Sequence, residues 1–110
     1  MKKINIIKKS IDFNKAINNG KRYSNKYYYI YKERNDVKYY RFGICVSKKI
    51  GNAVTRNKNK RQVKDIIDKS NLLFKSNTDY VIILKKEINN IDFNLKRQYL
   101  IDLLKQVEGE

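Results

Sequence analysis

The segment from Lys48 to Lys64 constrains this chain more than any other part of its sequence. It holds seven basic residues and no acidic one. The basic residues are Lys48, Lys49, Arg56, Lys58, Lys60, Arg61 and Lys64. At about 100° per residue, Val63, Ile66 and Ile67 share one face of a helix, and most of the basic residues of that helix share another. The segment is therefore predicted to form a helix with one face for a core and one for phosphates.

The whole chain carries a large positive charge. Its 110 residues include 26 Lys and Arg and 11 Asp and Glu, which gives a net charge of +15. Unbalanced charge destabilises a compact domain unless an anion neutralises it, so a nucleic acid is the first expected partner and an acidic membrane surface the second. The hydrophobic content of 41% supplies the core of one domain, 1–110, with a basic N-terminal extension at 1–9.

Several functional classes are excluded by what the chain lacks. It contains no His, which removes His-dependent acid–base catalysis, His–Cys zinc sites and Ser-His-Asp triads. Its single cysteine, Cys45, cannot form an internal disulfide, and we expect it to be small and partly buried. No apolar run approaches the ~18 residues of a membrane-spanning helix, and the N-terminus lacks the apolar stretch of a secretory signal. A cytoplasmic location is therefore expected.

Three segments have the periodicity of amphipathic helices. The first spans 10–20, with Ser10 as its candidate N-cap and Gly20 just past its end. Each of the other two helices has two candidate capping residues, and the sequence leaves both choices open. These are Asn52 or Thr55 for the second helix, which runs to about Asn71, and Asp92 or Asn94 for the third.

Two strands are predicted before the second helix, at 27–32 and 39–47. The polar connection between them has the length of a hairpin loop. In the first strand, alternation places three aromatic side chains on one face, and these are Tyr27, Tyr29 and Tyr31.

The second of these strands has an apolar face that must point to the core. Its opposite face then forms a low floor made of Gly43, Cys45 and Ser47. If the two strands pair, the tyrosines of the first stand beside this floor and form a groove.

A third strand, 79–84, is apolar on both faces and is therefore expected to be central. The predicted order is helix, strand, strand, helix, strand, helix. This order indicates a mixed α/β sandwich, in which the strand–helix–strand segment contributes at least one parallel pair.

A specific pattern overlaps the basic segment. Val-Ser-Lys-Lys at 46–49 is followed by Gly-Asn-Ala-Val at 51–54 and by Arg-Asn-Lys-Asn-Lys-Arg at 56–61. This pattern resembles the signature of the bacterial ribonuclease P protein component. The resemblance extends over essentially the whole chain, through Asp12-Phe13, Gly20, Asn25 to Tyr31, and Asp79 to Ile83.

The resemblance implies a non-catalytic partner of a catalytic RNA. The ribonucleoprotein of that family hydrolyses precursor tRNA at the 5′ end of the mature tRNA, and its magnesium is bound mainly by the RNA. The resemblance also implies an α/β (α+β) two-layer sandwich similar to a ribosomal protein domain, with a left-handed β-α-β crossover. Neither a membrane nor a small-molecule substrate is expected, and the sequence assigns no metal ligand on the protein.

Two sets of site residues follow from the resemblance, position by position. The set expected to dock on the catalytic RNA is Lys48, Lys49, Arg56, Asn57, Lys58, Lys60, Arg61 and Lys64. The set expected to line a groove for the single-stranded 5′ leader is Phe13, Ile17, Tyr29, Tyr31 and Ser47. Periodicity alone favours a core position for Phe13, and Ile17 stands where the family commonly has an aromatic residue.

Other functions stay open from the residues themselves. The charge run could be an ordinary solvated helix face, although it lacks the Glu partners typical of one. Another RNA-binding protein of ribosomal-protein-like fold would use the same charge without needing a groove. A membrane-surface protein is disfavoured because the aliphatic face of the basic helix is needed for the core. A self-sufficient nuclease needs converging carboxylates, and only Asp65 and Asp68 lie near the basic helix.

Overall fold

A four-stranded sheet forms the centre of the computed structural model, which describes residues 1–109. The helices are α1 (Ser10–Asn19), α2 (Ala53–Lys69) and α3 (Phe93–Glu108), with short 3-10 helices η1 (Lys3–Asn5) and η2 (Lys86–Asn90). The strands are β1 (Lys21–Ser24), β2 (Tyr28–Arg34), β3 (Arg41–Cys45) and β4 (Thr78–Leu84). In space they follow the order β1-β2-β4-β3, so β4 is central, as expected.

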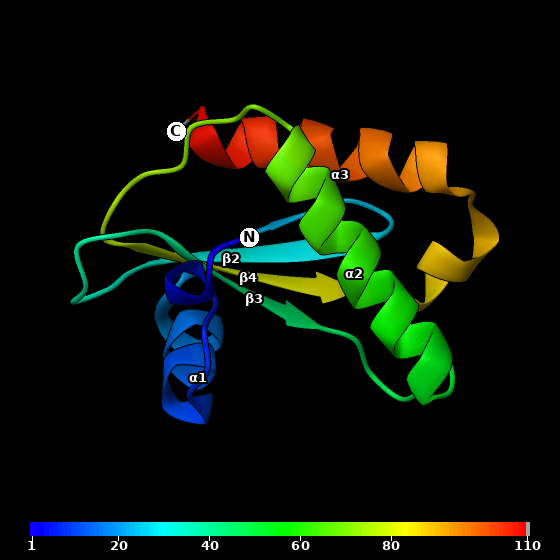
Figure 1. The fold of residues 1–110 in the computed structure, drawn as a ribbon, viewed down its shortest axis with the longest axis horizontal. Coiled ribbons are helices and arrows are strands. Elements are labelled where there is room, and N and C mark those ends of the chain that lie inside the picture. The colour runs from blue at the N-terminus through cyan, green and yellow to red at the C-terminus, as the bar shows by residue number, and fades with distance from the viewer. Residues whose placement is uncertain (110) are drawn as a thin grey trace.

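Helices cover both faces of this sheet. Figure 1 shows α2 and α3 above it and α1 below it. The larger core lies between the sheet and the α2–α3 layer and includes Tyr28, Phe42 and Tyr80. A smaller core lies under α1, around Ile7, Ala16 and Val81. The predicted α/β sandwich is confirmed, and α1 adds a partial layer on its other side.

The structure settles where each helix begins. The Asn52 side chain accepts a hydrogen bond from the Thr55 backbone N–H at 3.0 Å and caps α2. Asp92 caps α3 in the same way through the Leu95 N–H, also at 3.0 Å. The expected Ser10 cap is wrong, because Ser10 is already helical and Lys9 precedes it without a side-chain cap.

Gly20 ends α1 for a different reason from the one expected. Its φ of −76° is ordinary, so no left-handed turn requires glycine there. A Cβ at this position would lie 2.9 Å from the Lys32 carbonyl oxygen and nearer still to that of Ala16. Glycine is needed because two backbone segments approach each other closely.

The expected hairpin between the first two predicted strands is wrong. β4 lies between them and pairs with β2 antiparallel and with β3 parallel. β4 is apolar on both faces, so it is most stable in the middle of the sheet, where its two faces are covered. This preference outweighs the tendency of β2 and β3 to pair through the short loop between them. The loop after β2 turns to β4 instead, where the Asn35 N–H donates to the Asn77 carbonyl at 2.8 Å. The ring of Tyr40 packs on those of Phe42 and Phe74.

The strand β1 was not predicted. It has only four residues, three of them polar, and pairs antiparallel with β2. The turn between them is made by Asn25, whose side-chain oxygen accepts from the backbone N–H groups of Tyr27 and Tyr28. Tyr27 therefore belongs to the turn. Its ring packs on Tyr99 of α3 with centroids 4.6 Å apart, so its predicted place beside Tyr29 is wrong.

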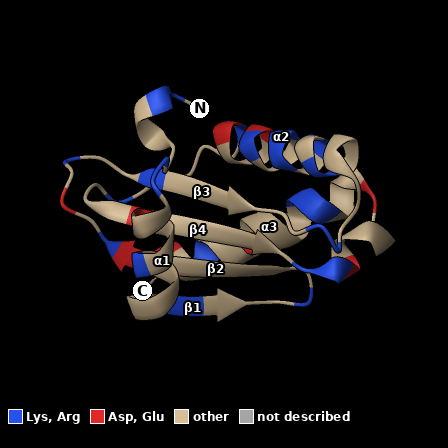
Figure 2. Ribbon diagram, turned by 90° about the horizontal axis from the view of Figure 1, so that it is seen from below, with Lys and Arg blue, Asp and Glu red and all other residues tan. Residues whose placement is uncertain are grey.

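The connection from β3 through α2 to β4 has the left hand that the resemblance implied. Both strands point to the right in Figure 2, with β3 above β4. That view is from below, so α2 lies behind the sheet. Seen from the helix side with the strands pointing up, the chain moves to the left, against the strong general preference for right-handed crossovers.

The first nine residues lie along the sheet. The Ile7 N–H donates to the Phe42 carbonyl at 2.9 Å, and the Ile7 side chain is buried. The Met1 ammonium lies 2.6 Å from an Asp68 carboxylate oxygen of α2. The expected basic extension therefore packs against β3 and α2.

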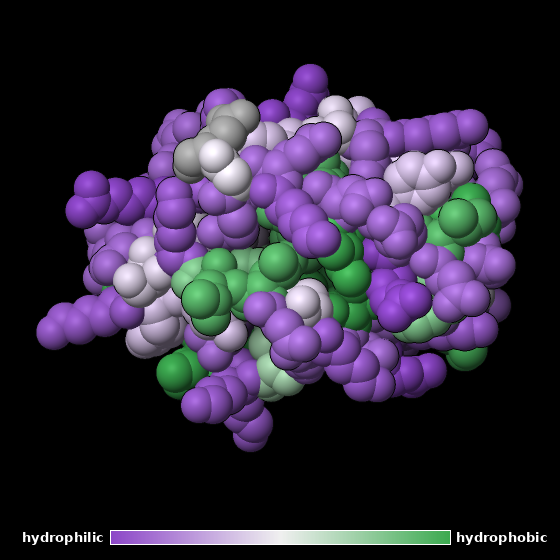
Figure 3. All heavy atoms as spheres, turned by 90° about the horizontal axis from the view of Figure 1, so that it is seen from above, coloured by the Kyte–Doolittle hydropathy of each residue, from purple (hydrophilic) through white to green (hydrophobic). Residues whose placement is uncertain are grey.

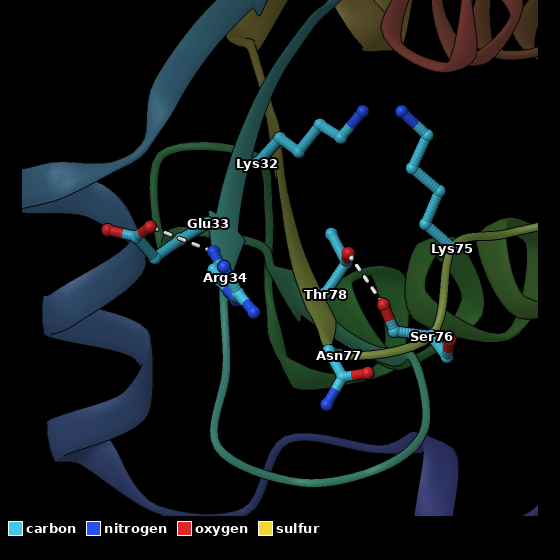
Figure 4. A pocket seen from close by; sticks show the side chains of 7 residues that line it. All are labelled: Lys32, Glu33, Arg34, Lys75, Ser76, Asn77 and Thr78. Carbon is cyan, nitrogen blue, oxygen red and sulfur yellow. Dashed lines mark hydrogen bonds between the residues drawn. The ribbon is translucent and has the colours of Figure 1, made fainter.

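Two hollows lie away from the α1 face of the sheet. Figure 3 shows the α2–α3 side, where apolar side chains are exposed among polar ones. A cleft of about 220 Å³ is lined there by residues that include Ile66, Phe93 and Ile101. The other hollow, of about 430 Å³, lies where β2 ends and β4 begins, and Figure 4 shows Lys32 and Lys75 pointing into it. There the Lys32 ammonium donates to the Val107 carbonyl at 3.1 Å, which stabilises the last turn of α3.

Candidate nucleic-acid interface

The α1 face of the sheet carries two rows of side chains that run across the strands. The register pairs Val81 of β4 with Tyr31 and Gly43, and it pairs Ile83 with Tyr29 and Cys45. The first row lies under α1, where Val81 is fully buried. The three residues of the second row, Tyr29, Ile83 and Cys45, are only half-buried. The second row therefore forms an apolar floor beside α1.

Phe13 lies at the boundary between α1 and this floor. A Cβ at Gly43 would lie 2.7 Å from Cζ of Phe13 and closer still to its Cε1, so the ring rests on the Gly43 backbone. Phe13 stays half-buried and belongs to the small core with Ile17 and Tyr31. The structure thus brings together three of the five predicted groove residues. The core position that periodicity favoured for Phe13 is confirmed, while its half-buried ring stays partly accessible.

The other two predicted groove residues, Ser47 and Tyr29, are not part of this small core. Ser47 is exposed just after β3, where its carbonyl accepts the Ile50 N–H at 3.1 Å. Tyr29 is in the floor, but its ring is next to two cations. The Lys85 ammonium lies 4.1 Å from the ring centroid, and the Arg22 guanidinium lies 5.1 Å from it.

Three residues of this surface were missed by the sequence analysis. Ile83 separates the tyrosines from Cys45, because β4 stands between β2 and β3. Alternation along the apolar strand, together with its central position, could have placed Ile83 on this face. Arg22 and Lys85 gave no such signal, because Arg22 lies on the unpredicted β1 and Lys85 directly follows β4.

The predicted docking residues line the loop after β3 and the exposed side of α2, where Figure 2 shows a run of basic residues. Lys48 and Lys49 are exposed in the turn before α2. On the helix, three members are exposed and three are half-buried. The exposed ones are Asn57, Lys58 and Arg61, and the half-buried ones are Arg56, Lys60 and Lys64.

Lys60 connects the basic face to the floor. Burial raises the pKa of the Cys45 thiol, and the positive charge of Lys60 partly opposes this rise in pKa. The floor is therefore bordered by α1, and its Cys45 interacts electrostatically with a cation of α2.

An ion-pair cluster fixes α1 against the sheet. The Arg41 guanidinium donates two hydrogen bonds of 2.8 Å to the buried carboxylate of Asp79. It also lies 3.4 Å from Asp12, which stands next to Phe13 on α1. The Asn35 side chain donates to Asp79 at 2.7 Å. These contacts hold the start of α1, and with it Phe13, in register with β3.

The two carboxylates near the basic helix have other partners. Asp68 pairs with the Met1 ammonium, and Asp65 lies 3.1 Å from Lys69 one turn along α2. Among residues 1–109, no group of three or more His, Cys, Asp or Glu side chains is arranged to hold a metal ion. Within the same residues, no helix has both the length and the apolar character needed to cross a membrane.

Comparison with known proteins agrees with this arrangement. The family model described as Ribonuclease P matches residues 1–108. The ribonuclease P protein component of Listeria innocua is 37% identical over 106 residues, covering 96% of this chain and 89% of the relative. That of Mesoplasma florum is 42% identical over 99 residues, covering 87% and 90%.

Solved structures share the fold. The RNase P protein of Staphylococcus aureus superposes with a TM-score of 0.83 at 31% identity, covering 94% of each chain. The RNase P protein of Thermotoga maritima gives a TM-score of 0.76 at 34% identity, covering 86% of this chain and 90% of the other. The match in sequence, length and architecture covers both the apolar floor and the basic helix, and the chain belongs to the ribonuclease P protein family.

Proposed function

We propose that this ribonuclease P subunit uses two separate surfaces, one for the catalytic RNA and one for the 5′ leader of precursor tRNA. Membership of the family makes the chain part of the ribonucleoprotein endoribonuclease that acts in tRNA 5′ processing. The proposal concerns how its own residues serve that activity. Because precursor tRNA is the proposed substrate, we place this work in the cytoplasm.

The leader surface is the floor between α1 and α2, and this floor is the observation that carries the proposal. Its half-buried row of Tyr29, Ile83 and Cys45 offers apolar contacts that do not depend on base identity. Phe13 and Tyr31 stand at its α1 side, and the positive charge of Lys60 acts on Cys45. An apolar and aromatic strip with cations at its margins suits a single strand, whose bases stack while its phosphates pair with the cations.

The docking surface is the exposed side of α2 together with the turn before it. Lys48, Lys49 and Arg61 are exposed there, and no acidic residue falls between 48 and 64. The N-terminus of α2 adds the partial positive charge of a helix end. Structured RNA presents closely spaced phosphates, so such a surface favours it over a neutral partner.

We assign the cleavage chemistry and the magnesium to the RNA. The residues of this chain position the substrate: the floor holds the leader, and α2 holds the RNA. Once the leader and the catalytic RNA are both bound to the protein, the scissile phosphodiester is held at the RNA's catalytic site. Less translational and rotational entropy is then lost in reaching the transition state. Neutralisation of phosphate repulsion by the +15 protein lowers the magnesium concentration that the complex requires.

Cleavage of precursor tRNA at low magnesium tests this proposal. Three reactions are compared, with the catalytic RNA alone, with this protein alone, and with both. We expect cleavage only with both, and we expect the RNA alone to cleave when magnesium is raised. Cleavage by the protein alone, persisting through repeated purification, would contradict the division of labour.

The docking surface has its own test. If about five phosphates are neutralised, log K for assembly falls with log salt concentration at a slope of roughly −3.5 to −4.5. Arg61→Ala should make that slope shallower by about one. Lys69→Ala is the matched control, because Lys69 lies on the same helix but pairs with Asp65 at the far end. An unchanged slope for Arg61→Ala would place Arg61 outside the interface.

A ribosomal protein is the competing assignment for the same charge. The two are distinguished by what the protein co-purifies with from cells. One structured RNA of a few hundred nucleotides supports the proposal, and ribosomes contradict it.

A further inference from the structure

Lys96 of α3 is held beside the basic helix in an unusual way. Its ammonium donates to the side-chain oxygens of Asn59, at 3.3 Å, and Gln62, at 3.2 Å, both on α2. Neither acceptor carries a charge, and within residues 1–109 no carboxylate pairs with Lys96. The chain therefore fixes a cation next to its docking surface without neutralising it.

Further hydrogen bonds hold both the clamp and the backbone of Lys96 in place. Asn59 is buried, with 4% of its surface exposed, and its amide N–H donates to the Thr55 carbonyl at 3.0 Å. The backbone of Lys96 is fixed as well, because its carbonyl accepts from the buried Tyr28 hydroxyl at 2.9 Å. A lysine held at both ends has already lost the side-chain freedom that binding an anion normally removes.

The clamp leaves binding capacity free. An ammonium has three N–H donors, and two of them are used by Asn59 and Gln62. Lys58 is exposed on α2 and is adjacent to both clamp residues, being next to Asn59 in sequence and one helical turn before Gln62. Burial lowers the pKa of the Lys96 ammonium, and the positive charge of Lys58 lowers it further. Two cations that repel each other at close range are stabilised together by one anion.

We propose that Lys96 and Lys58 form a phosphate-binding site for the catalytic RNA, which extends the docking surface from α2 onto α3. The third N–H of Lys96 and the flexible ammonium of Lys58 converge on one phosphodiester oxygen pair. The signature of the basic segment includes Lys58 but gives no sign of Lys96, which lies 35 residues beyond Arg61 in the chain. The proposal rests on the proposed function, and it adds a second helix to the RNA contact.

The test measures holoenzyme assembly with the catalytic RNA across a series of KCl concentrations. Lys96→Gln keeps a side chain that can hydrogen-bond to Asn59 and Gln62 but removes the charge. We expect its log K to depend less steeply on log salt, by about 0.7 to 0.9. Arg97→Gln is the matched control, because it removes the same charge at the next position of α3. Arg97 lines the cleft with Lys69 and Phe93, away from the clamp, and its slope should equal that of the wild type.

Two further variants separate a binding role from a structural one. Lys96→Arg keeps the charge and should restore most of the slope. The Lys58→Gln and Lys96→Gln double variant should lose less affinity than the product of the two single losses, because both residues serve one phosphate. An unchanged slope for Lys96→Gln with a lowered melting temperature would overturn the proposal and leave Lys96 as a tie between helices. If the double variant instead loses affinity by the full product of the two single-variant losses, the two lysines do not share one phosphate.

Arg61→Ala, measured in the same series, separates this inference from the function on which it rests. If Arg61→Ala flattens the slope and Lys96→Gln does not, the α3 site fails alone. If neither changes it, the docking surface itself is wrongly assigned.

Discussion

The ring of Phe13 rests on the backbone of Gly43, at a distance that leaves no room for even one methyl group between them. This contact joins α1 to β3 and sets how closely α1 approaches the floor that we propose as the leader surface. Its consequences can be measured separately as stability and as leader binding.

Gly43→Ala should destabilise the protein and weaken leader binding together. The new methyl must displace Phe13, and overpacking of this kind costs about 1–3 kcal/mol. Urea unfolding measures the stability, and the affinities for precursor and mature tRNA measure the leader contact. In a Phe13→Leu background the same methyl finds more room, so stability should recover while precursor binding stays weak. If precursor binding recovers as well, Phe13 supports the fold only.

Tyr31 should contribute to precursor binding alone. Stacking on an unpaired base is worth roughly 1–3 kcal/mol, so Tyr31→Ala should weaken precursor-tRNA binding by about 5- to 150-fold. Mature tRNA, which has no leader, should bind the holoenzyme as before, and assembly with the catalytic RNA should be unchanged. Tyr31→Phe keeps the ring and serves as the control. Equal losses for precursor and mature tRNA would show that Tyr31 acts in folding or general RNA binding.

The ion pair between Arg41 and Asp79 should be costly to break from one side. Asp79 is 4% exposed, and Arg41→Met leaves its carboxylate buried without a cation. The expected loss in the free energy of unfolding is about 3–5 kcal/mol, measured by urea denaturation. The Arg41→Met and Asp79→Leu double variant removes both charges and should be more stable than Arg41→Met alone. A double variant less stable than either single one would contradict this account.

Cys45 should report whether the floor is occupied. Burial raises the pKa of its thiol, so the reactive thiolate is scarce near neutral pH and increases as pH rises through that raised pKa. Alkylation of the free protein should therefore be slow at neutral pH and faster in alkaline solution. Precursor tRNA should slow the alkylation in the holoenzyme, whereas mature tRNA should not. Equal protection by both would place Cys45 outside the leader path.

The same pKa shift makes a small contribution to stability that depends on pH. The folded state favours the protonated thiol, because its pKa is raised relative to that of the unfolded chain. This contribution is present below the unfolded pKa and is lost as pH rises through the folded pKa. Cys45→Ser removes this pH-dependent contribution. The pH dependence of the free energy of unfolding should therefore differ most between the wild type and Cys45→Ser in alkaline solution.

Periodicity predicted the elements whose own side chains form a core, and missed those that depend on pairing. Val63, Ile66 and Ile67 define α2 from sequence because each lies on its buried face. β1 has no such pattern, since its four residues are ordered by backbone pairing with β2. The apolar run predicted that β4 is central, but the sequence did not show that β2 and β3 flank it on either side.

The candidate site shows the same division. The resemblance indicated Phe13, Tyr31 and the α2 residues, and the structure places Phe13 and Tyr31 together beside α1 and the others along α2. It gave no information about Ile83, which enters the floor through the strand order, or about Lys96, which reaches α2 only after α3 has packed. Contacts between elements that are distant in sequence can be identified only once the three-dimensional fold is known.

The edge strand β1 gives the positive charge of this protein a second role. Two of its four residues are Lys21 and Arg22, and the sheet order leaves it without a strand neighbour on its outer side. An outer strand of this kind is a template for pairing with another copy, and cations along it oppose that association. Selection for solubility at this edge and selection for RNA affinity therefore act on the same kind of side chain. Replacing Lys21 and Arg22 with Thr should promote aggregation of the free protein even though no residue of α2 has changed.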